Sequence, residues 1–423
     1  MDPLSSSDPM RLTQVGIERL PDRIRLVGRV KRLSRGSVPW AVSDAHFAES
    51  SDFANEIRFE FSREHEAFVS DAGDAFAIAL LLPSMAAGEP LELEVPVSES
   101  LLFELAGIRD IFHTWYPRFH RVPIHGDPRA TAPALPRGRS AATFFSGGVD
   151  SFYTLLKRLD HDPLPAPMRY MIFMHGVEQS LEDSEATEAS QRRAERIAVR
   201  TGVECIVGTT NLRSLFPLHW ERYYFGSALA AIASTLAGGL SYVCIPSSFT
   251  YRHQVPHGSS PLVDDRFSTP SIRIVHDGGE ASRAMKTARI VEWAPELVLE
   301  NLRVCILNSG GDFNCGRCYK CVRTAVALEA LGVRGRMTSF RDASTEHWDR
   351  VMLDDHPVLT AENLELARER GANPALVARL ERVVRRIHRY DGVAAYAKNS
   401  PLQHLLPVYR RARELAGGRP RMH

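Results

Sequence analysis

The hexapeptide SGGVDS at 146–151 constrains the fold of this chain more than any other part of its sequence. The apolar run 141–145 before it predicts a buried strand. After it, apolar residues recur at helical spacing over 152–159 and predict one face of a helix. Two adjacent glycines permit a sharp turn that leaves backbone N–H groups exposed. Because those groups would lie at a helix N-terminus, the segment predicts a strand–turn–helix unit that binds an anion such as phosphate.

The side chains of the hexapeptide add chemistry to this turn. Ser146 and Ser151 offer hydroxyl donors, and Asp150 offers a hard oxygen for Mg²⁺. The sequence has no Gly-x-x-x-x-Gly-Lys-Ser/Thr and no Gly-x-Gly-x-x-Gly, which excludes the ordinary P-loop NTPases and the usual dinucleotide fingerprint. Instead, SGGVDS resembles the signature of the PP-loop ATP pyrophosphatases, which cleave ATP to AMP and pyrophosphate while they adenylate a substrate oxygen. On that resemblance the nucleotide contacts Ser146, Gly147, Gly148, Val149, Asp150 and Ser151.

Patterns along the chain predict three regions. Over 1–125, short segments alternate apolar and polar residues, as half-exposed antiparallel strands do, and predict an α+β accessory domain. The Pro- and Gly-containing stretch 125–139 predicts a linker. Over 139–332, strand and helix patterns alternate, which indicates an α/β fold with a parallel sheet; the PP-loop resemblance implies a HUP-like domain. Residues 333–423 predict a helical C-terminal region.

Charge and hydropathy narrow the functional classes. The net charge of +1 excludes a general attraction to nucleic acid or membranes. From Arg379 onward there are eleven Lys or Arg against three Asp or Glu, which we interpret as a solvated face, with an acidic partner or nucleic acid as the alternative. The N-terminus lacks the apolar core of a secretory signal, and the apolar stretch 226–240 is too short to span a bilayer. We therefore expect a cytoplasmic protein with no membrane partner.

Segments that follow the predicted strands are candidate substrate sites, because ligands of parallel sheets bind at the carboxyl ends of the strands. One such segment begins at His175. Another is the long polar loop 246–270, which we interpret as a substrate loop, with a solvated excursion as the alternative. The candidate substrate residues are His175, His257, Asp264, Asp265 and Arg266.

Four cysteines form the second strong pattern. Three of them have the spacing Cys-x₂-Cys-x₂-Cys, and a fourth lies ten positions upstream. A closed Cys₄ set of this kind predicts structural zinc, with an iron–sulfur cluster as the alternative. The predicted ligands are Cys305, Cys315, Cys318 and Cys321. Cys205 and Cys244 lie in apolar strand patterns, which predicts inert core residues.

The two motifs together allow a narrower comparison. SGGVDS followed by CGRCYKC resembles the 7-cyano-7-deazaguanine synthases of queuosine biosynthesis, over roughly residues 140–332. The resemblance implies ATP, Mg²⁺ and Zn²⁺, with Asp150 and Lys286 as catalytic residues; an exposed lysine with no role is the alternative for Lys286. The family's Asp-Tyr-Gly-Gln run is replaced here by a run that begins His175-Gly176, and its substrate loop also differs. The ATP chemistry is therefore implied and the substrate is not.

The expected activity is that of a ligase in which a carboxylate attacks the α-phosphorus of ATP and a nitrogen nucleophile then displaces AMP. The expected substrate is a deazaguanine-like carboxylate or a modified macromolecule, and a homodimer is one option for the assembly. One alternative is tRNA thiolation, for which Cys205 and Cys244 are weak candidates as sulfur carriers. The other is a nucleotide-gated binding or conjugation component.

Overall fold

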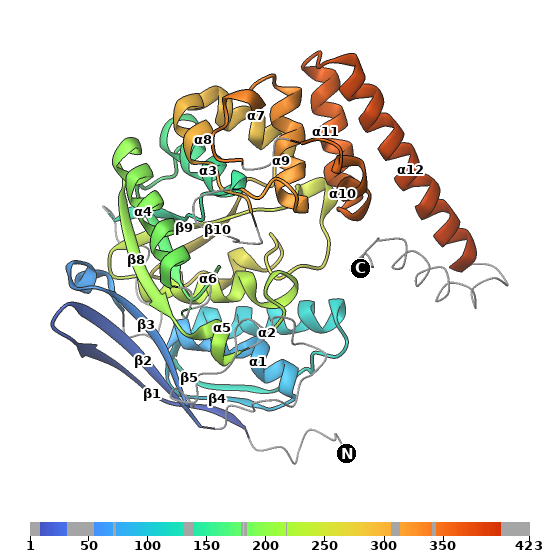
Figure 1. Cartoon of the computed structure of the whole chain (residues 1–423). Helices are drawn as coiled ribbons and strands as arrows, with labels where there is room; N and C mark the ends of the chain where they lie inside the picture. The colour runs from blue at the N-terminus through green and yellow to red at the C-terminus, as the bar shows by residue number, and fades with distance from the viewer. Residues whose placement is uncertain are drawn as a thin grey trace. The chain divides into compact units, whose positions relative to one another are not determined.

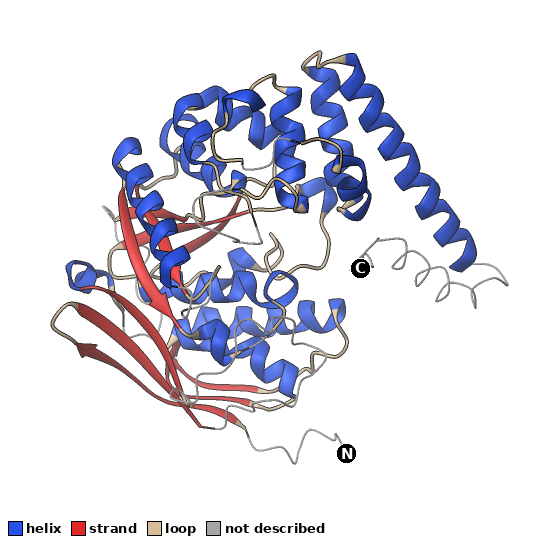
Figure 2. Ribbon diagram, viewed as in Figure 1, coloured by secondary structure: helices blue, strands red, loops and turns tan. Residues whose placement is uncertain are grey.

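The computed structural model of the chain describes residues 9–31, 55–70, 73–129, 139–178, 181, 184–216, 218–305, 314–340 and 344–398. Its helices and strands are labelled in Figure 1 and coloured by type in Figure 2. The chain divides into two compact units. The first comprises Met1–Ser146 and Thr154–Gly279, and the second comprises Gly147–Tyr153 and Glu280–His423. The segment after the glycine turn therefore belongs with the C-terminal part of the chain.

A single sheet of ten strands organises the first unit, in the order β10-β9-β6-β7-β8-β3-β2-β1-β4-β5 within the described residues. The strands are β1 (Met10–Arg19), β2 (Arg23–Lys31), β3 (Glu56–Ser62), β4 (Leu91–Ser98), β5 (Ile124–Arg129), β6 (Ser140–Phe144), β7 (Met168–His175), β8 (Glu204–Thr210), β9 (Leu240–Pro246) and β10 (Arg273–Asp277).

The strands β6 to β10 form the parallel half of the sheet that the sequence predicts. Across the sheet these strands lie in the order β8-β7-β6-β9-β10. Numbered by their place along the chain, that order is 3-2-1-4-5, which is Rossmann-like and doubly wound. The order reverses between β6 and β9, where Ala142 pairs with both Tyr170 and Val243. In such sheets the crevice at the carboxyl ends of the two strands at the reversal is the usual ligand site. The α/β prediction is confirmed, and β6 leads to that crevice.

The N-terminal strands extend this same sheet. β3 pairs antiparallel with β8, and Phe59 lies opposite Thr210. Asn211 secures the junction, because its side chain accepts from the backbone of Arg58 and donates to the backbone of Glu56, both at 2.8 Å. The predicted boundary near residue 125 thus does not divide the sheet. An alternating pattern identifies a strand but not its neighbour, and the outer edge of β8 has backbone groups that need a partner.

The predicted linker also contains structure. Its first residues belong to β5, which pairs in parallel with β4, Leu91 lying opposite Ile124. Residues 130–138 lie outside the described residues. The composition that predicted a linker includes Pro128, and β5 is the terminal strand of the sheet, where a proline costs least.

Helices α1 (Asp74–Ala87), α2 (Glu99–Trp115), α4 (Ser184–Thr201), α5 (Leu212–Leu215) and α6 (Phe225–Thr235) cover the sheet of the first unit. Nearly all of α1 and α6 is buried, and hydroxyl groups join them: Tyr224 donates to the carbonyl of Ala79 and Ser227 to that of Ile78. Figure 1 shows α1 and α2 beside β4 and β5, which they contact. The N-terminal helices therefore share one core with α6, a helix of the parallel half.

The second unit is helical. It contains the first turn of α3 (Val149–Leu156), with α7 (Arg283–Trp293), α8 (Pro295–Asn301), α9 (Tyr319–Ala330), α10 (Trp348–Asp354), α11 (Pro357–Glu369) and α12 (Pro374–Lys398). Its core runs from Ala284 in α7 through Val326 and Trp348 to Ile387 in α12. The predicted boundary at 332 falls inside this core, so the C-terminal helices are part of the unit that holds α7 and α9. No helix within the described ranges is long and apolar enough to cross a membrane.

Candidate functional site

The glycine turn has the predicted local structure. It follows β6, and Gly147 has a φ of 78°, in the left-handed region that glycine adopts without strain. α3 then begins at Val149. The hydroxyl of Ser151 donates to the carbonyl of Gly148 at 3.0 Å, and the backbone N–H of Arg303 donates to the carbonyl of Gly147 at 2.9 Å. Hydrogen bonds from both sides thus fix the turn before a helix N-terminus, the arrangement that suits an anion.

Two cationic side chains from α7 converge on Asp150. Arg283 donates to one carboxylate oxygen, and the Lys286 ammonium lies 3.3 Å from the other. Burial by itself would raise the pKa of the Asp150 carboxyl, but the charges of Arg283 and Lys286, with a contribution from Lys320, outweigh it and hold this pKa below its ordinary value. Asp150 is therefore an ionised carboxylate set among cations.

The structure shows whether the side chain of Lys286 is exposed, while its predicted catalytic role stays a prediction. The side chain is buried, with 1% of its surface exposed, so the alternative of an exposed helix lysine is wrong. Its ammonium also lies 5.7 Å from the ring centre of Tyr153. The Tyr153 hydroxyl donates to Glu280 and accepts from Arg289, and its ring stacks on Trp293. Packing of the first turns of α3 against α7 therefore fixes where the lysine lies.

The first turn of α7 is held at two points. The Ser282 hydroxyl caps it by accepting from the backbone N–H of Met285 at 3.1 Å. From α11, the Glu362 carboxylate accepts from the backbone N–H of Arg283 at 3.0 Å. Burial raises the pKa of Glu362 above its ordinary value, although that hydrogen bond acts in the opposite direction. The sequence indicates a phosphate-contacting lysine or arginine in the run 282–287, and the prediction names Lys286 and not Arg283. Nothing local marks Glu362, and sequence reasoning missed it.

The four predicted metal ligands come together. One ligand atom from each of Cys305, Cys315, Cys318 and Cys321 lies within 4.8 Å of all the others. A tetrahedral zinc ion with Zn–S bonds of about 2.3 Å would set its sulfurs about 3.8 Å apart. The Sγ atoms of Cys315 and Cys321 are 3.8 Å apart. A two- or four-iron cluster distributes its four thiolates over several iron atoms and needs a wider set, so the spacing fits one metal ion.

Short-range contacts shape the sulfur cluster. Gly316 turns with a φ of 77°, which allows the backbone N–H groups of Arg317 and Cys318 to donate to the sulfur of Cys315. Hydrogen bonding to Cys305 and then Cys318, with burial, raises the pKa of the Cys321 thiol. A bound cation is therefore what would hold these sulfurs as thiolates.

Two residues that sequence reasoning missed form hydrogen bonds with the backbone of the segments that carry the cysteines. Asn314 is buried and accepts from the backbone N–H groups of Val304 and Cys305, at 2.8 and 3.2 Å. The ring of His347 bonds the carbonyl of Gly316 at 2.9 Å. Asn314 adjoins the cysteine motif and could have been suspected for that reason, whereas His347 lies outside it.

The predicted substrate loop contains two short 3₁₀ turns, Tyr251–His253 and Asp264–Phe267, and its two aspartates hold one histidine. Asp264 is fully buried and accepts from the ring of His276 at 2.8 Å and from the Ser259 hydroxyl at 2.6 Å. Asp265 accepts from the backbone N–H of His276, also at 2.8 Å. The Nε2 atom of His276 is buried and has no hydrogen-bond partner among the described residues. The loop is thus anchored to β10, and sequence reasoning missed His276.

The other predicted substrate residues have separate partners. His175 bonds the amide of Gln191 at 2.8 Å, and Arg266 pairs with Glu104 of α2. His257 adjoins the Asp264 group through Ser259, and burial lowers the pKa of its imidazole. The structure therefore brings His257, Asp264 and Asp265 into one network and gives His175 and Arg266 other contacts; a substrate role for each stays a prediction.

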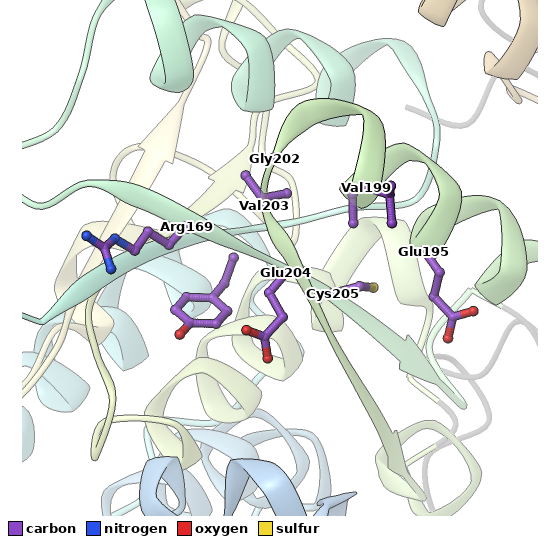
Figure 3. A pocket seen from close by; sticks show the side chains of 9 residues that line it. Arg169, Glu195, Val199, Gly202, Val203, Glu204 and Cys205 are labelled. Atoms are coloured by element: carbon purple, nitrogen blue, oxygen red, sulfur yellow. The ribbon is translucent and has the colours of Figure 1, made fainter.

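A cavity of about 670 Å³ lies in the first unit, where β7 and β8 begin and α4 ends, as Figure 3 shows. It is at the amino ends of these strands, opposite the edge to which β6 leads. Cys205 lines it, and burial raises the pKa of this thiol to about 12. Burial likewise raises the pKa of Cys244 in β9. Both thiols are thus protonated at neutral pH, which does not suit a sulfur carrier.

Comparisons with family models, with curated proteins and with solved structures give no match.

Proposed function

We propose that this chain is an ATP-dependent ligase of the PP-loop type, which activates a carboxylate with ATP and joins it to a nitrogen nucleophile. The glycine turn carries the proposal. It follows the strand at which the order of the parallel sheet reverses, and Asp150 within it is bound by Arg283 and Lys286. Backbone donors at a helix start, combined with an arginine and a lysine, suit the phosphates of a nucleotide.

The proposed reaction has two steps. A carboxylate oxygen of the substrate attacks the α-phosphorus of ATP, and the bond to pyrophosphate breaks. The nitrogen nucleophile then attacks the activated carboxyl carbon and loses a proton, and AMP leaves. Fixed donors and charges suffice for such steps, since the protein mainly positions the reactants and stabilises the developing charge.

The residues of the site take distinct roles in this proposal. Backbone N–H groups of 146–151 hold the phosphates, and Lys286 neutralises charge on the departing pyrophosphate. Asp150 would hold Mg²⁺; it is ionised and 15% exposed, and its hard oxygens fit this ion. When bound, Mg²⁺ neutralises phosphate charge. At the sulfur cluster, zinc would serve structure, because four thiolates leave it no open position.

The substrate is proposed from the sequence resemblance as a 7-carboxy-7-deazaguanine or a relative, with a modified macromolecule as the alternative. A cytoplasmic location is proposed with it. tRNA thiolation is less well supported, because the thiols of Cys205 and Cys244 are protonated at neutral pH. A nucleotide-gated binding component would bind ATP without cleaving it.

The test is exchange of labelled pyrophosphate into ATP by the full chain, with Mg²⁺ and 7-carboxy-7-deazaguanine. We expect exchange that depends on the carboxylate. Lys286→Gln should lose it, whereas Arg273→Gln, a change at an exposed side chain of β10, should retain it. Binding of ATP without exchange would favour the binding component instead.

A further inference from the structure

We infer that Arg283 is a phosphate-binding residue that trades its contact with Asp150 for a phosphate oxygen when Mg²⁺-ATP binds, and that Glu362 is the residue that positions it. The inference rests on the proposed function and deepens it. It assigns a role to a side chain outside the glycine motif and makes the C-terminal helices part of the nucleotide site.

The hydrogen bonding of Arg283 is incomplete. Its side chain is 10% exposed, and one terminal nitrogen donates to Asp150. Its Nε atom is buried and has no hydrogen-bond partner within the described part of the chain. An arginine presents its N–H donors as a planar fork that matches two oxygens of a phosphate. A buried donor of this kind beside the glycine turn is what an incoming phosphate oxygen would satisfy.

The charges around Asp150 favour an exchange of partners. Arg283 and Lys286 both contact the Asp150 carboxylate, and Lys320 adds its field. The charge of Arg323 also acts on Asp150, but Arg323 forms its direct ion pair with Asp355. A phosphate brings negative charge to Arg283, and Mg²⁺ brings positive charge to Asp150. Both groups therefore keep an opposite charge throughout the exchange, which a buried pair requires.

Glu362 explains why Arg283 can change partner without moving its backbone. The carboxylate holds the N–H of Arg283 itself, at the first residue of α7, where negative charge also suits the helix dipole. Ser282 and Glu362 together fix the first turn, so only the side chain needs to turn. Glu362 lies in α11 and is 7% exposed, hence the C-terminal helices set the position of the arginine.

The proposed exchange predicts how the affinity for nucleotide depends on Mg²⁺. Without the ion, a nucleotide must compete with Asp150 for Arg283 and Lys286 and also meets the negative charge of Asp150. Asp150→Asn removes that competitor. We therefore expect this variant to bind Mg²⁺-free nucleotide more tightly than the unmodified chain does, while it gains little from Mg²⁺.

Calorimetric titration of the full chain with α,β-methylene-ATP, which is not cleaved at the α-phosphorus, tests these statements with and without added Mg²⁺. With Mg²⁺, we expect Arg283→Gln to weaken binding about 10- to 100-fold, the range for loss of a charged hydrogen bond. Arg273→Gln, a change at an exposed side chain of β10, is the control and should bind normally. Without Mg²⁺, Asp150→Asn should bind at least about tenfold more tightly than the unmodified chain.

Glu362 is tested by rescue. Glu362→Ala should weaken binding with Mg²⁺, and Glu362→Gln should restore most of it, because an amide oxygen also accepts from the backbone of Arg283. Glu362→Met keeps most of the side-chain bulk but offers no oxygen acceptor, so it should bind as weakly as Glu362→Ala; a purely packing role would instead let Glu362→Met bind as well as Glu362→Gln.

The outcomes separate the two proposals. If the unmodified chain does not bind the analogue with Mg²⁺, the proposed function fails and the inference fails with it. If it binds and Arg283→Gln binds as tightly as the control Arg273→Gln, only the inference is overturned. Tighter Mg²⁺-free binding by Asp150→Asn cannot arise from misfolding and would support the exchange. Its absence in a variant with the thermal stability of the unmodified chain counts against the exchange.

Discussion

Asp150 and Asp264 are both aspartates that follow parallel strands, yet the structure gives them opposite surroundings. Asp150 is 15% exposed and bonded to Arg283 and Lys286, whose charges a phosphate could share. Asp264 is fully buried, and its carboxylate accepts hydrogen bonds from Ser259, Ser260 and His276. The first carboxylate can exchange partners when a charged ligand arrives, and the second can only lose partners.

The comparison shows what distinguishes a candidate binding residue from an anchor. Residue type and position after a strand are the same in both cases, so neither identifies the role. The difference lies in the donors: largely buried cationic side chains at Asp150, and a hydroxyl, a backbone N–H and an oriented ring at Asp264. Asp264 is therefore expected to act on stability, and its predicted role in substrate binding would be indirect, through His276.

Loss of the metal ion should produce the largest effect, and it should destabilise the helices around Asp150 without affecting the strand around Asp264. Cys318→Ser removes one of the four sulfurs, and metal sites of this type contribute of the order of 10 kcal/mol to folding. We expect loss of the ion and of protection from hydrogen exchange in α7 and α9, while β10 around Asp264 remains protected. Elemental analysis and exchange mass spectrometry measure both. Cys205→Ser is the control and should retain the ion; one ion retained by Cys318→Ser would contradict the ligand set.

Asp150→Ala should abolish pyrophosphate release and leave the first unit folded. The loss should exceed roughly a thousandfold, because the variant removes the proposed Mg²⁺ ligand and leaves two cations without their carboxylate. Carboxylate-dependent release of pyrophosphate is the measurement, with circular dichroism as the check on folding. Release at the rate of the unmodified chain would remove Asp150 from the mechanism and erase the contrast with Asp264.

Asp264→Ala should show the reverse pattern. The variant leaves His276 and Ser259 without their buried acceptor, which should lower the free energy of unfolding by about 2–4 kcal/mol. The affinity for ATP should stay near that of the unmodified chain. Urea denaturation measures the loss, and Asp265→Ala, which breaks one bond to the His276 backbone, should cost less. Unchanged stability in Asp264→Ala would show that the network is not an anchor.

The smallest expected effect is on the reactivity of the Cys205 thiol, which like Asp264 is a group that its surroundings keep from reacting with a ligand. With a pKa of about 12, Cys205 should be a thiolate in roughly one molecule in ten thousand at pH 8. Its alkylation by iodoacetamide should therefore be slow and should accelerate about tenfold per pH unit below that pKa. Mass spectrometry of the labelled peptide gives the rate. Labelling as fast as a free cysteine peptide at pH 8 would reopen a sulfur-carrier role.

Features encoded within one segment could be predicted from the sequence. The turn before α3 and the Cys-x₂-Cys-x₂-Cys motif depend on glycines and spacings that fit few other structures, and the structure has both. The parallel half of the sheet follows from alternating strand and helix patterns. These are local signals, and they remained valid without knowledge of tertiary contacts.

Features made by distant segments could not be predicted. Glu362 reaches Arg283 from another helix, and His276 meets Asp264 only because the loop folds back on β10. Lys286 has the sequence context of an exposed lysine, and its burial depends on how α3 and α7 pack. The pairing of β3 with β8 also depends on tertiary structure, because a strand pattern in the sequence does not identify the neighbouring strand.

The β3–β8 junction has a consequence for synthesis on the ribosome. Asn211 and its partner Arg58 are separated by 153 residues, so β3 emerges long before the strand that completes it. At 5–20 residues per second, its pairing edge stays open for roughly 8–30 s. An open strand edge can pair with another nascent chain, and β3 carries alternating charged side chains, which discourage such pairing. Arg58 and the two glutamates of β3 would then protect a half-made sheet from pairing with other chains while the remainder is translated.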